Sequence, residues 1–178
     1  KRFLAASGIG VAPHAVITRA EDFDQLQAAL LPGILKSARL GYDGKGQARV
    51  ATVAGARAAW DLMGRVPCVL EQKLALQLEL SVVVARGRDG AVTTFPVSEN
   101  EHRGGILAVS IVPARIDDAM AQRARDAAIA VARAMNYVGV LCVEFFVLAD
   151  GRLLANEIAP RPHNSGHWTL DASVTSQY

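Results

Sequence analysis

The stretch E-I-A-P-R-P-H-N-S-G-H-W, residues 157–168, follows an apolar run that is typical of a buried strand. Within it the chain presents a carboxylate, an arginine, two histidines and an asparagine, on a path that two prolines and a glycine constrain. Polar side chains gathered directly after a buried strand are costly unless a ligand or a partner satisfies them. We therefore interpret this stretch as one wall of a site that holds a charged small molecule.

A β-hairpin is predicted immediately upstream of that stretch. The pair Asp150-Gly151 separates two apolar runs, and Asp-Gly in this setting is typical of a two-residue type I′ turn. Counting back from such a turn places Glu144 opposite Glu157, with the two residues roughly 5 Å apart. Asn156 lies beside the pair, and on ideal alternation its side chain points to the other face of the sheet.

The two facing carboxylates indicate a metal site. Ionised carboxylates at that separation repel each other by about 3 kcal/mol at an effective dielectric constant near 20. A hard divalent cation removes the repulsion, and Mg²⁺ is commonly bound by one or two carboxylates together with substrate phosphates. Glu144 and Glu157 are therefore predicted Mg²⁺ ligands. The alternatives are a pair that shares one proton and a hairpin register that differs by one residue.

The composition is that of a globular chain without an evident surface for a nucleic acid or a membrane. Its 178 residues are 51% hydrophobic and 20% charged, and 19 basic against 17 acidic residues give a net charge of +2. The basic residues are scattered, and no apolar stretch reaches membrane-spanning length. We expect no signal peptide, and because Cys68 and Cys142 lie in apolar runs we expect buried free thiols in a cytoplasmic protein. Both ends look cut, which suggests a segment of a longer protein.

Periodicity and turn signals predict an α+β fold. Helices are expected where apolar residues recur at helical spacing, at residues 20–31, 54–63 and 117–135. Strands are expected where short apolar runs are bounded by turn residues, at 34–37, 47–52, 68–72, 76–86, 91–97 and 105–112 and in the hairpin. Antiparallel hairpins with a few helices laid over them are typical of the α+β class.

A glycine-rich loop, L-G-Y-D-G-K-G-Q at residues 40–47, is a candidate phosphate-binding segment. Glycines allow backbone N–H groups to turn toward an anion, and Lys36, Arg39 and Lys45 supply positive charge. The loop is not a Walker motif, because no G-K-[S/T] opens a helix there. Its spacing suits a hairpin tip that folds over phosphates, and a mobile surface turn is the alternative.

Three weaker signals are compatible with a bound nucleotide. The segment from Glu71 to Leu74 leaves a buried strand, so its backbone groups could read an adenine edge. Glu79 lies beside an apolar strand, and a carboxylate can accept hydrogen bonds from ribose hydroxyls. These features, and His102 between two charged residues, are equally compatible with a solvated sheet edge.

Taken together, these motifs resemble the ATP-grasp superfamily. The resemblance rests on a lysine before G-Y-D-G-K-G-Q, on L-E-Q and E-L-S-V, and on the segment N-E-I-A-P-R-P-H-N-S-G-H-W-T at residues 156–169. That segment and the loop are similar to the N5-carboxyaminoimidazole ribonucleotide synthetases within the superfamily. The resemblance covers nearly the whole chain and implies one ATP-grasp domain over residues 1–178. Its two α+β subdomains, at about 15–72 and about 73–178, would clamp the nucleotide with antiparallel sheets.

The resemblance also implies a role for each matching residue, with ATP and Mg²⁺ as cofactors. Glu144 and Glu157 would be the metal ligands. Bicarbonate, carboxyphosphate and the ribonucleotide would lie against Arg161, His163, Asn164 and His167, whose histidines could move a proton because their pKa values are near neutrality. The nucleotide would be held by Lys36, Gly41, Tyr42, Asp43, Gly44, Lys45, Gly46, Gln47, Glu71, Gln72, Lys73, Leu74, Glu79, His102, Asn156 and Glu157.

The implied reaction is an ATP-dependent ligation in purine biosynthesis. Bicarbonate would be phosphorylated to carboxyphosphate, which would carboxylate 5-aminoimidazole ribonucleotide, with ADP and phosphate as the other products. Another ATP-grasp carboxylate–amine ligase is the alternative, as is a nucleotide-binding fragment without turnover. The family's domains before Lys1 and after Tyr178 are absent from this chain, so the segment alone could be inactive. The expected partners are small molecules and, in a homodimer, a second copy of the chain.

Overall fold

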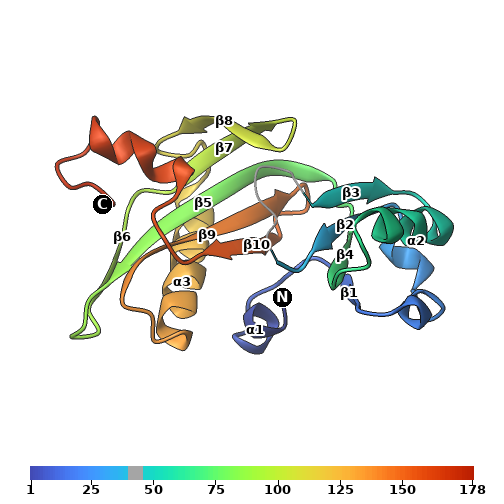
Figure 1. Cartoon of the computed structure of the whole chain (residues 1–178). Coiled ribbons are helices and arrows are strands. Elements are labelled where there is room, and N and C mark those ends of the chain that lie inside the picture. Colours follow the sequence, from blue (N-terminus) through green and yellow to red (C-terminus); the bar gives the residue numbers. More distant parts are fainter. Residues whose placement is uncertain (40–45) are drawn as a thin grey trace. The chain divides into compact units, whose positions relative to one another are not determined.

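In the computed structural model, which describes residues 1–39 and 46–178, the chain forms two units (Figure 1). The smaller unit comprises residues 12–74 and 104–106, and the larger unit comprises residues 1–11, 75–103 and 107–178. Each unit is built on its own antiparallel sheet. The α+β class that the hairpins predict is therefore confirmed.

The smaller unit contains a four-stranded sheet in the order β1-β4-β2-β3. A helix and two short 3-10 helices, written η, pack against one face of it. Along the chain these elements are β1 (His14–Ile17), η1 (Ala20–Phe23), η2 (Ala28–Leu30), β2 (Gly33–Ser37), β3 (Gln47–Val50), α2 (Val53–Leu62) and β4 (Cys68–Gln72).

Alternation along the strands of the smaller unit separates a buried face from a polar one. Leu35 of β2 faces Leu70 of β4, and both are fully buried in a core that also contains Trp60 of α2. The next residues along the two strands, Lys36 and Glu71, point to the opposite face, because side chains of a strand alternate. The sheet therefore presents a lysine and a glutamate on the face that α2 does not cover.

The larger unit contains a six-stranded sheet. Its strands β10, β9, β5, β7 and β8 are neighbours in that order, and β6 pairs with β5. Figure 1 shows α3 crossing this sheet behind β5 and β9. The elements are α1 (Arg2–Ala6), β5 (Leu76–Arg86), β6 (Val92–Thr94), β7 (Ser98–Arg103), β8 (Ile106–Ile111), α3 (Asp118–Ala134), β9 (Gly139–Leu148), β10 (Leu153–Ala159) and η3 (Asn164–Leu170).

The core of the larger unit lies between α3 and the central strands β5 and β9. Val82, Val143 and Phe145 are almost completely buried on the side of the sheet that faces the helix. They form one apolar cluster with Ala128 and Val131 of α3. Burial of these side chains is the main stabilising contribution to this unit, at about 1.5–3 kcal/mol for each large apolar group.

The opposite face of the same sheet is polar. Residues that alternate with the core residues of four neighbouring strands point to this side, as the pairing registers show. We call this set the polar face, and it consists of Glu79, Ser81, Ser98, Asn100, His102, Glu144, Asn156 and Glu157.

The predicted helix at residues 20–31 is wrong, because this run forms the separate 3-10 helices η1 and η2. The Asp22 carboxylate accepts hydrogen bonds from the backbone N–H groups of Thr18 and Arg19. Such local bonds compete with a continuous helix. Pro32 also limits the run, since the residue before a proline disfavours helical backbone.

The sequence patterns do not predict β7, whose residues S-E-N-E-H-R are all polar. Ser98, Glu99 and Asn100 are nevertheless buried. Asn100 donates a hydrogen bond to Ser81, and Glu99 accepts hydrogen bonds from Arg115. The partners of these buried polar side chains lie elsewhere in the sequence. The sequence of β7 therefore lacks the alternation of apolar and polar residues by which a strand is predicted.

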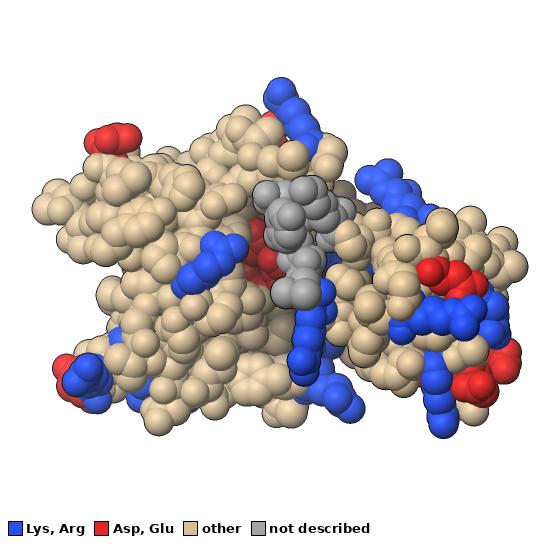
Figure 2. All heavy atoms as spheres, viewed as in Figure 1, with Lys and Arg blue, Asp and Glu red and all other residues tan. Residues whose placement is uncertain are grey.

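Charged side chains are spread over the surface rather than segregated. In Figure 2 the Lys and Arg atoms of the described residues form no continuous stripe across the visible face, in keeping with a net charge of +2. A stripe of that kind would be expected along a nucleic-acid path. Within residues 1–39 and 46–178, none of the helices has the length and apolar character needed to span a bilayer.

Candidate functional site

Glu144 of β9 and Glu157 of β10 face each other across the hairpin, as the sequence predicts. The pairing that leads to this contact differs from the prediction. Next to the turn Ala155 pairs with Phe145, which is one residue away from the register of a two-residue turn. A β-bulge at Asn156 then adds one residue to β10 and brings Glu157 opposite Glu144.

The bulge also determines where Asn156 points. The expectation that its side chain lies on the other face is wrong, because its Nδ2 donates a hydrogen bond to Glu144 Oε2 at 3.3 Å. The extra residue of a bulge commonly re-aims a side chain in this way. Glu144, Asn156 and Glu157 therefore bring three oxygen-bearing side chains to one place on the polar face.

Glu144 lies in a largely dry environment. Its side chain is 11% exposed, and its Oε1 lies 3.4 Å from Nε2 of His163. Burial, followed by the negative charge of Glu157, raises the pKa of Glu144 to about 7. A cation between the two carboxylates would offset both effects.

His163 is the residue before η3, and both of its ring nitrogens have partners. The Ser165 N–H donates to Nδ1 at 3.3 Å, and the Ser165 hydroxyl lies 2.9 Å from the same atom. Because Nδ1 accepts, the neutral ring carries its proton on Nε2, which faces Glu144. Burial, and then the charge of Arg161, lowers the pKa of His163 to about 4. The near-neutral pKa expected of a proton carrier therefore does not hold for this histidine.

A second pair of ionisable groups lies on the polar face, on β5 and β7. Glu79 Oε2 is 3.1 Å from Nδ1 of His102, close enough for an ion pair although the N–H direction is not aligned for a hydrogen bond. The pKa of His102 is raised by Glu79, against the effect of burial, and further by the charges of Glu144 and Glu157. The structure thus places Glu79 and His102, which were both predicted to bind the nucleotide, on the same face of the sheet as Glu144 and Glu157.

Three further polar residues form side-chain hydrogen bonds between neighbouring strands of this sheet, and none of them was a predicted site residue. Asn100 Nδ2 donates to Ser81 Oγ at 3.0 Å, and Ser110 Oγ donates to Asn100 Oδ1 at 3.1 Å. Ser81 pairs with Glu144 in the register of β5 and β9. The alternation in E-L-S-V could have signalled Ser81, whereas nothing local signals Asn100.

The donor atoms of the polar face suit a hard cation. Glu144 and Glu157 supply carboxylates, and Asn156 carries an amide oxygen. Over the described part of the chain, no group of three or more His, Cys, Asp or Glu side chains is arranged to hold a metal by itself. Mg²⁺ often uses one or two carboxylates and takes its other ligands from water and phosphate. The residues present therefore fit a Mg²⁺ that is shared with phosphates.

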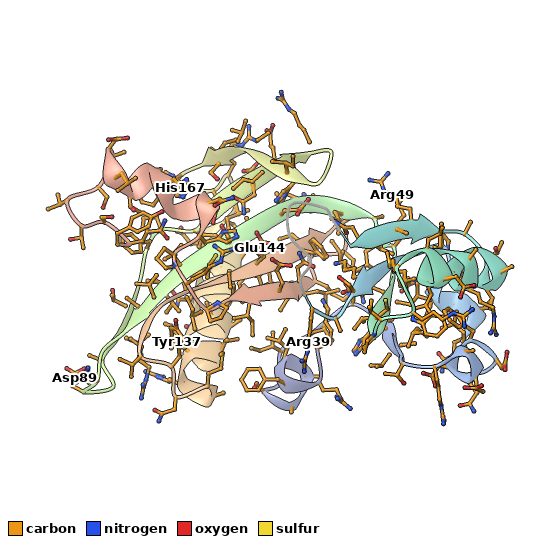
Figure 3. All side chains as sticks on the ribbon, in the orientation of Figure 1. Arg39, Arg49, Asp89, Tyr137, Glu144 and His167 are labelled. Carbon is orange, nitrogen blue, oxygen red and sulfur yellow. The ribbon has the colours of Figure 1, made fainter. Side chains whose placement is uncertain are left out.

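Arg161, Asn164 and His167 are exposed on the larger unit. Figure 3 shows His167 on η3 and Glu144 on β9. Arg161 Nη1 donates to the carbonyl of the following proline at 2.8 Å. Of the four residues predicted to face bicarbonate and the ribonucleotide, these three are accessible to a ligand, whereas His163 is buried against Glu144.

Lys36 and Glu71 form an ion pair on the polar side of the smaller unit's sheet. Lys36 Nζ lies 3.3 Å from Glu71 Oε2, and Glu71 is 5% exposed. A buried carboxylate needs such a partner, because an isolated charge away from water is strongly disfavoured. The sequence indicates a nucleotide role for each residue, and the structure adds the contact between them.

Residues at the ends of the glycine-rich loop form backbone hydrogen bonds within the smaller unit. So do residues of the linker, which is the predicted adenine-binding segment at residues 71–74. The Ser37 N–H donates to Gly46 O at 2.7 Å, and Gln47 pairs with Lys36. The N–H groups of Gln72 and Lys73 donate to backbone carbonyls within the unit, so these two donors are not open to an adenine. The other predicted loop residues lie outside the described residues: Gly41, Tyr42, Asp43, Gly44 and Lys45.

The whole chain is similar to known proteins. The family model of the ATP-grasp domain matches residues 2–178. The N5-carboxyaminoimidazole ribonucleotide synthase of Bacillus subtilis is 44% identical over 179 residues, which cover 100% of this chain and 47% of that protein. The protein of the same name from Brucella melitensis is 49% identical over 184 residues, covering 100% of this chain and 50% of that protein. The chain thus spans about half the length of the curated relatives it matches.

Solved structures share the fold. The ADP complex of an N5-carboxyaminoimidazole ribonucleotide synthetase matches with a TM-score of 0.91 at 41% identity, over 99% of this chain and 47% of that chain. The N5-carboxyaminoimidazole synthase of Aspergillus clavatus, in complex with ADP and 5-aminoimidazole ribonucleotide, matches with a TM-score of 0.86 at 30% identity. That match covers 99% of this chain and 46% of the other.

Proposed function

The chain belongs to the ATP-grasp family, and from that premise we propose that it is the ATP-grasp part of an N5-carboxyaminoimidazole ribonucleotide synthetase. The full-length protein would use ATP and bicarbonate to carboxylate 5-aminoimidazole ribonucleotide. Relatives of that name at 44% and 49% identity over the whole chain support these substrates. So does the neighbour that carries ADP and 5-aminoimidazole ribonucleotide.

The observation that carries the proposal is the facing pair of Glu144 and Glu157, with Asn156 beside it on the polar face. These residues would hold Mg²⁺, which when bound supplies positive charge to the ATP phosphates. The raised pKa of Glu144 supports this assignment, because it reports an environment where added positive charge is favourable. His163, whose Nε2 lies 3.4 Å from Glu144 Oε1, would help to position that carboxylate.

The nucleotide contacts that the family resemblance implies are part of the same proposal. Lys36 and the loop at residues 41–47 would contact the phosphates, and the linker at residues 71–74 would contact the adenine. Glu79 would accept hydrogen bonds from the ribose hydroxyls, with His102 holding its carboxylate. Lys36 is suited to its role because a lysine ammonium is a compact charge on a flexible stem.

The chemistry would proceed in two steps. In the first, a bicarbonate oxygen attacks the γ-phosphorus of ATP, the bond to the bridging oxygen breaks, and carboxyphosphate and ADP form. In the second, the amine nitrogen of 5-aminoimidazole ribonucleotide attacks the carboxyl carbon, phosphate leaves, and the nitrogen loses a proton. Arg161, which is exposed, would bind the planar bicarbonate through parallel N–H groups. His167 is the exposed histidine of the same segment and would be the better proton acceptor.

We also propose a cytoplasmic setting for this reaction. Cys68 and Cys142 are free and buried, and free thiols are the rule in reducing compartments. A thiol-reducing environment keeps both side chains as small, buried apolar groups.

Product analysis with the full-length protein tests the proposed function. ADP and the N5-carboxylated ribonucleotide should form in equal amounts, and only when ATP, bicarbonate and 5-aminoimidazole ribonucleotide are all present. Coupled turnover with a different acid or amine would identify another ATP-grasp ligase and overturn the choice of substrates. ATP binding without phosphate release would identify a binding module and overturn the enzymatic assignment.

A further inference from the structure

Gln177 holds the backbone of His163 through two hydrogen bonds. The His163 N–H donates to Gln177 Oε1 at 3.0 Å, and Gln177 Nε2 donates to the His163 carbonyl at 2.8 Å. Gln177 is 2% exposed and His163 is 8% exposed, so both bonds are shielded from water. Because both the oxygen and the nitrogen of the buried carboxamide are hydrogen-bonded to His163, they limit the movement of the His163 backbone. We call this pair of bonds the clasp.

The clasp is held in place by η3. The Gln177 N–H donates to Thr169 Oγ1 at 3.1 Å, and the Thr169 hydroxyl donates to the Gly166 carbonyl at 2.7 Å. A Cβ at Gly166 would lie 2.5 Å from Gln177 Oε1 and 2.7 Å from its Cδ. The carboxamide therefore occupies space that exists because residue 166 has no side chain.

The clasp acts on a histidine whose ring faces the carboxylate pair. Ser165 fixes Nδ1 of His163, and Nε2 lies 3.4 Å from Glu144 Oε1. The position of the backbone decides where a ring can reach, so a shift of His163 would lengthen or misdirect its contact with Glu144. A chain of direct contacts thus runs from Gln177 through His163 to Glu144.

We propose that Gln177 is a positioning residue for ATP turnover, because its clasp on His163 holds the imidazole against Glu144. The inference rests on the proposed function, which assigns Glu144 to the metal and the ATP phosphates. Gly166 belongs to the same device, since it leaves room for the carboxamide.

Gln177→Met removes both hydrogen bonds and keeps the length of the side chain. In the full-length protein kcat should fall about 10- to 100-fold, the range for partners that orient a metal ligand. The KM for ATP should stay within about twofold, because no nucleotide contact is removed. Asp117→Ala is the matched control: it removes the cap that accepts the Met120 N–H at 2.7 Å, and so lowers stability away from the polar face. A Gln177→Met protein that loses stability like the control but keeps the wild-type kcat would overturn the proposal.

Gly166→Ala provides an independent test of the same contact. Its methyl group would displace the Gln177 carboxamide without removing it, so kcat should fall as it does in Gln177→Met. In a Gln177→Ala background the carboxamide is gone, and the same methyl group should add little further loss. Additive losses in the double variant would show that the two residues act separately, which is contrary to the proposal.

Nitrogen NMR of histidine-labelled full-length protein distinguishes this inference from the proposed function. The Nε2–H signal of His163, identified by its loss in His163→Gln, should shift or broaden in Gln177→Met and not in Asp117→Ala. An unchanged signal in Gln177→Met would contradict the positioning role of Gln177, whichever substrates the protein uses. If the wild-type protein forms no carboxylated ribonucleotide, the proposed function fails, and the NMR result still decides whether Gln177 positions His163.

Discussion

Glu144 and Glu157 face each other because β10 accommodates one extra residue, Asn156. At the turn the Leu148 N–H donates to the Arg152 carbonyl, so the connection is one residue longer than a two-residue turn. The bulge compensates for that residue. Without it Glu144 would face Asn156, and Glu157 would point to the side of the sheet that packs against α3.

Removing one charge of this pair should stop turnover and leave weak ATP binding. Glu157→Gln keeps the shape of the side chain but removes a carboxylate that Mg²⁺ would need. In the full-length protein we expect kcat to fall by about 100-fold or more at saturating Mg²⁺, because charge stabilisation of the transferred phosphoryl group is lost. Glu101→Gln, at an exposed carboxylate of β7, is the control and should retain activity. Near-wild-type turnover in Glu157→Gln would contradict the assignment of Glu157 as a Mg²⁺ ligand.

Arg161→Lys should impair the carboxylation and spare ATP binding. A guanidinium can hold a planar oxyanion through two parallel bonds, which a lysine cannot do. Loss of that contact should cost about 2–4 kcal/mol, or roughly 30- to 1000-fold in carboxylation-coupled turnover. Product formation and calorimetric ATP binding are measured for the same variant, with Arg133→Lys at an exposed position of α3 as the control. Lost ATP binding with intact turnover at saturating ATP would instead place Arg161 at the nucleotide.

The pair of His102 and Glu79 should make stability depend on pH. Glu79 raises the folded-state pKa of His102 above its ordinary value of 6.5. A raised histidine pKa contributes stability that is fully present below the unfolded-state pKa and is lost as the pH rises through the folded-state pKa. His102→Gln should therefore lower the free energy of unfolding more at about pH 6 than at about pH 9 in urea titrations. Equal losses at the two pH values would contradict a charged interaction between these residues.

Both thiols of the chain should be protected in the folded protein. Burial, and then the charge of Glu144, raises the pKa of Cys142 to about 12, and burial raises the pKa of Cys68. Reaction with a chromogenic aromatic disulfide requires a thiolate and access to it, so native labelling should be slow and should accelerate in urea. Mass spectrometry of the labelled protein assigns each site. Fast labelling of native Cys142 would show that the polar face opens to solvent.

Local patterns predict much of this fold correctly. β4 at Cys68–Gln72 matches the predicted strand, because its buried residues are adjacent in the sequence. α3 at Asp118–Ala134 also matches, since the Asp117 side chain caps its first turn by accepting the Met120 N–H. The hairpin around Asp150-Gly151 is likewise encoded by neighbouring residues.

The predictions fail where the deciding contact joins residues that are distant in the chain. Asn100 is buried in β7 because it bonds Ser81, 19 residues away, and Gln177 bonds His163, 14 residues away. Neither contact leaves a local signal. The facing carboxylates were predicted correctly although the turn is longer than assumed, because the bulge at Asn156 offsets the difference. Roles for the glycine-rich loop and the linker rest on family resemblance, since glycine spacing alone does not identify a ligand.

β9 carries stability and chemistry on alternate residues. Val143 and Phe145 pack against α3, whereas Cys142 and Glu144 point to the polar face. Substitutions at the two odd positions should lower the amount of folded protein in a cell, because they leave cavities in the core. Substitution of Glu144 should leave abundance intact and remove activity. Neighbouring codons of one short gene segment are therefore under different selective pressures, and a single base change at codon 144 can produce an abundant but inactive protein.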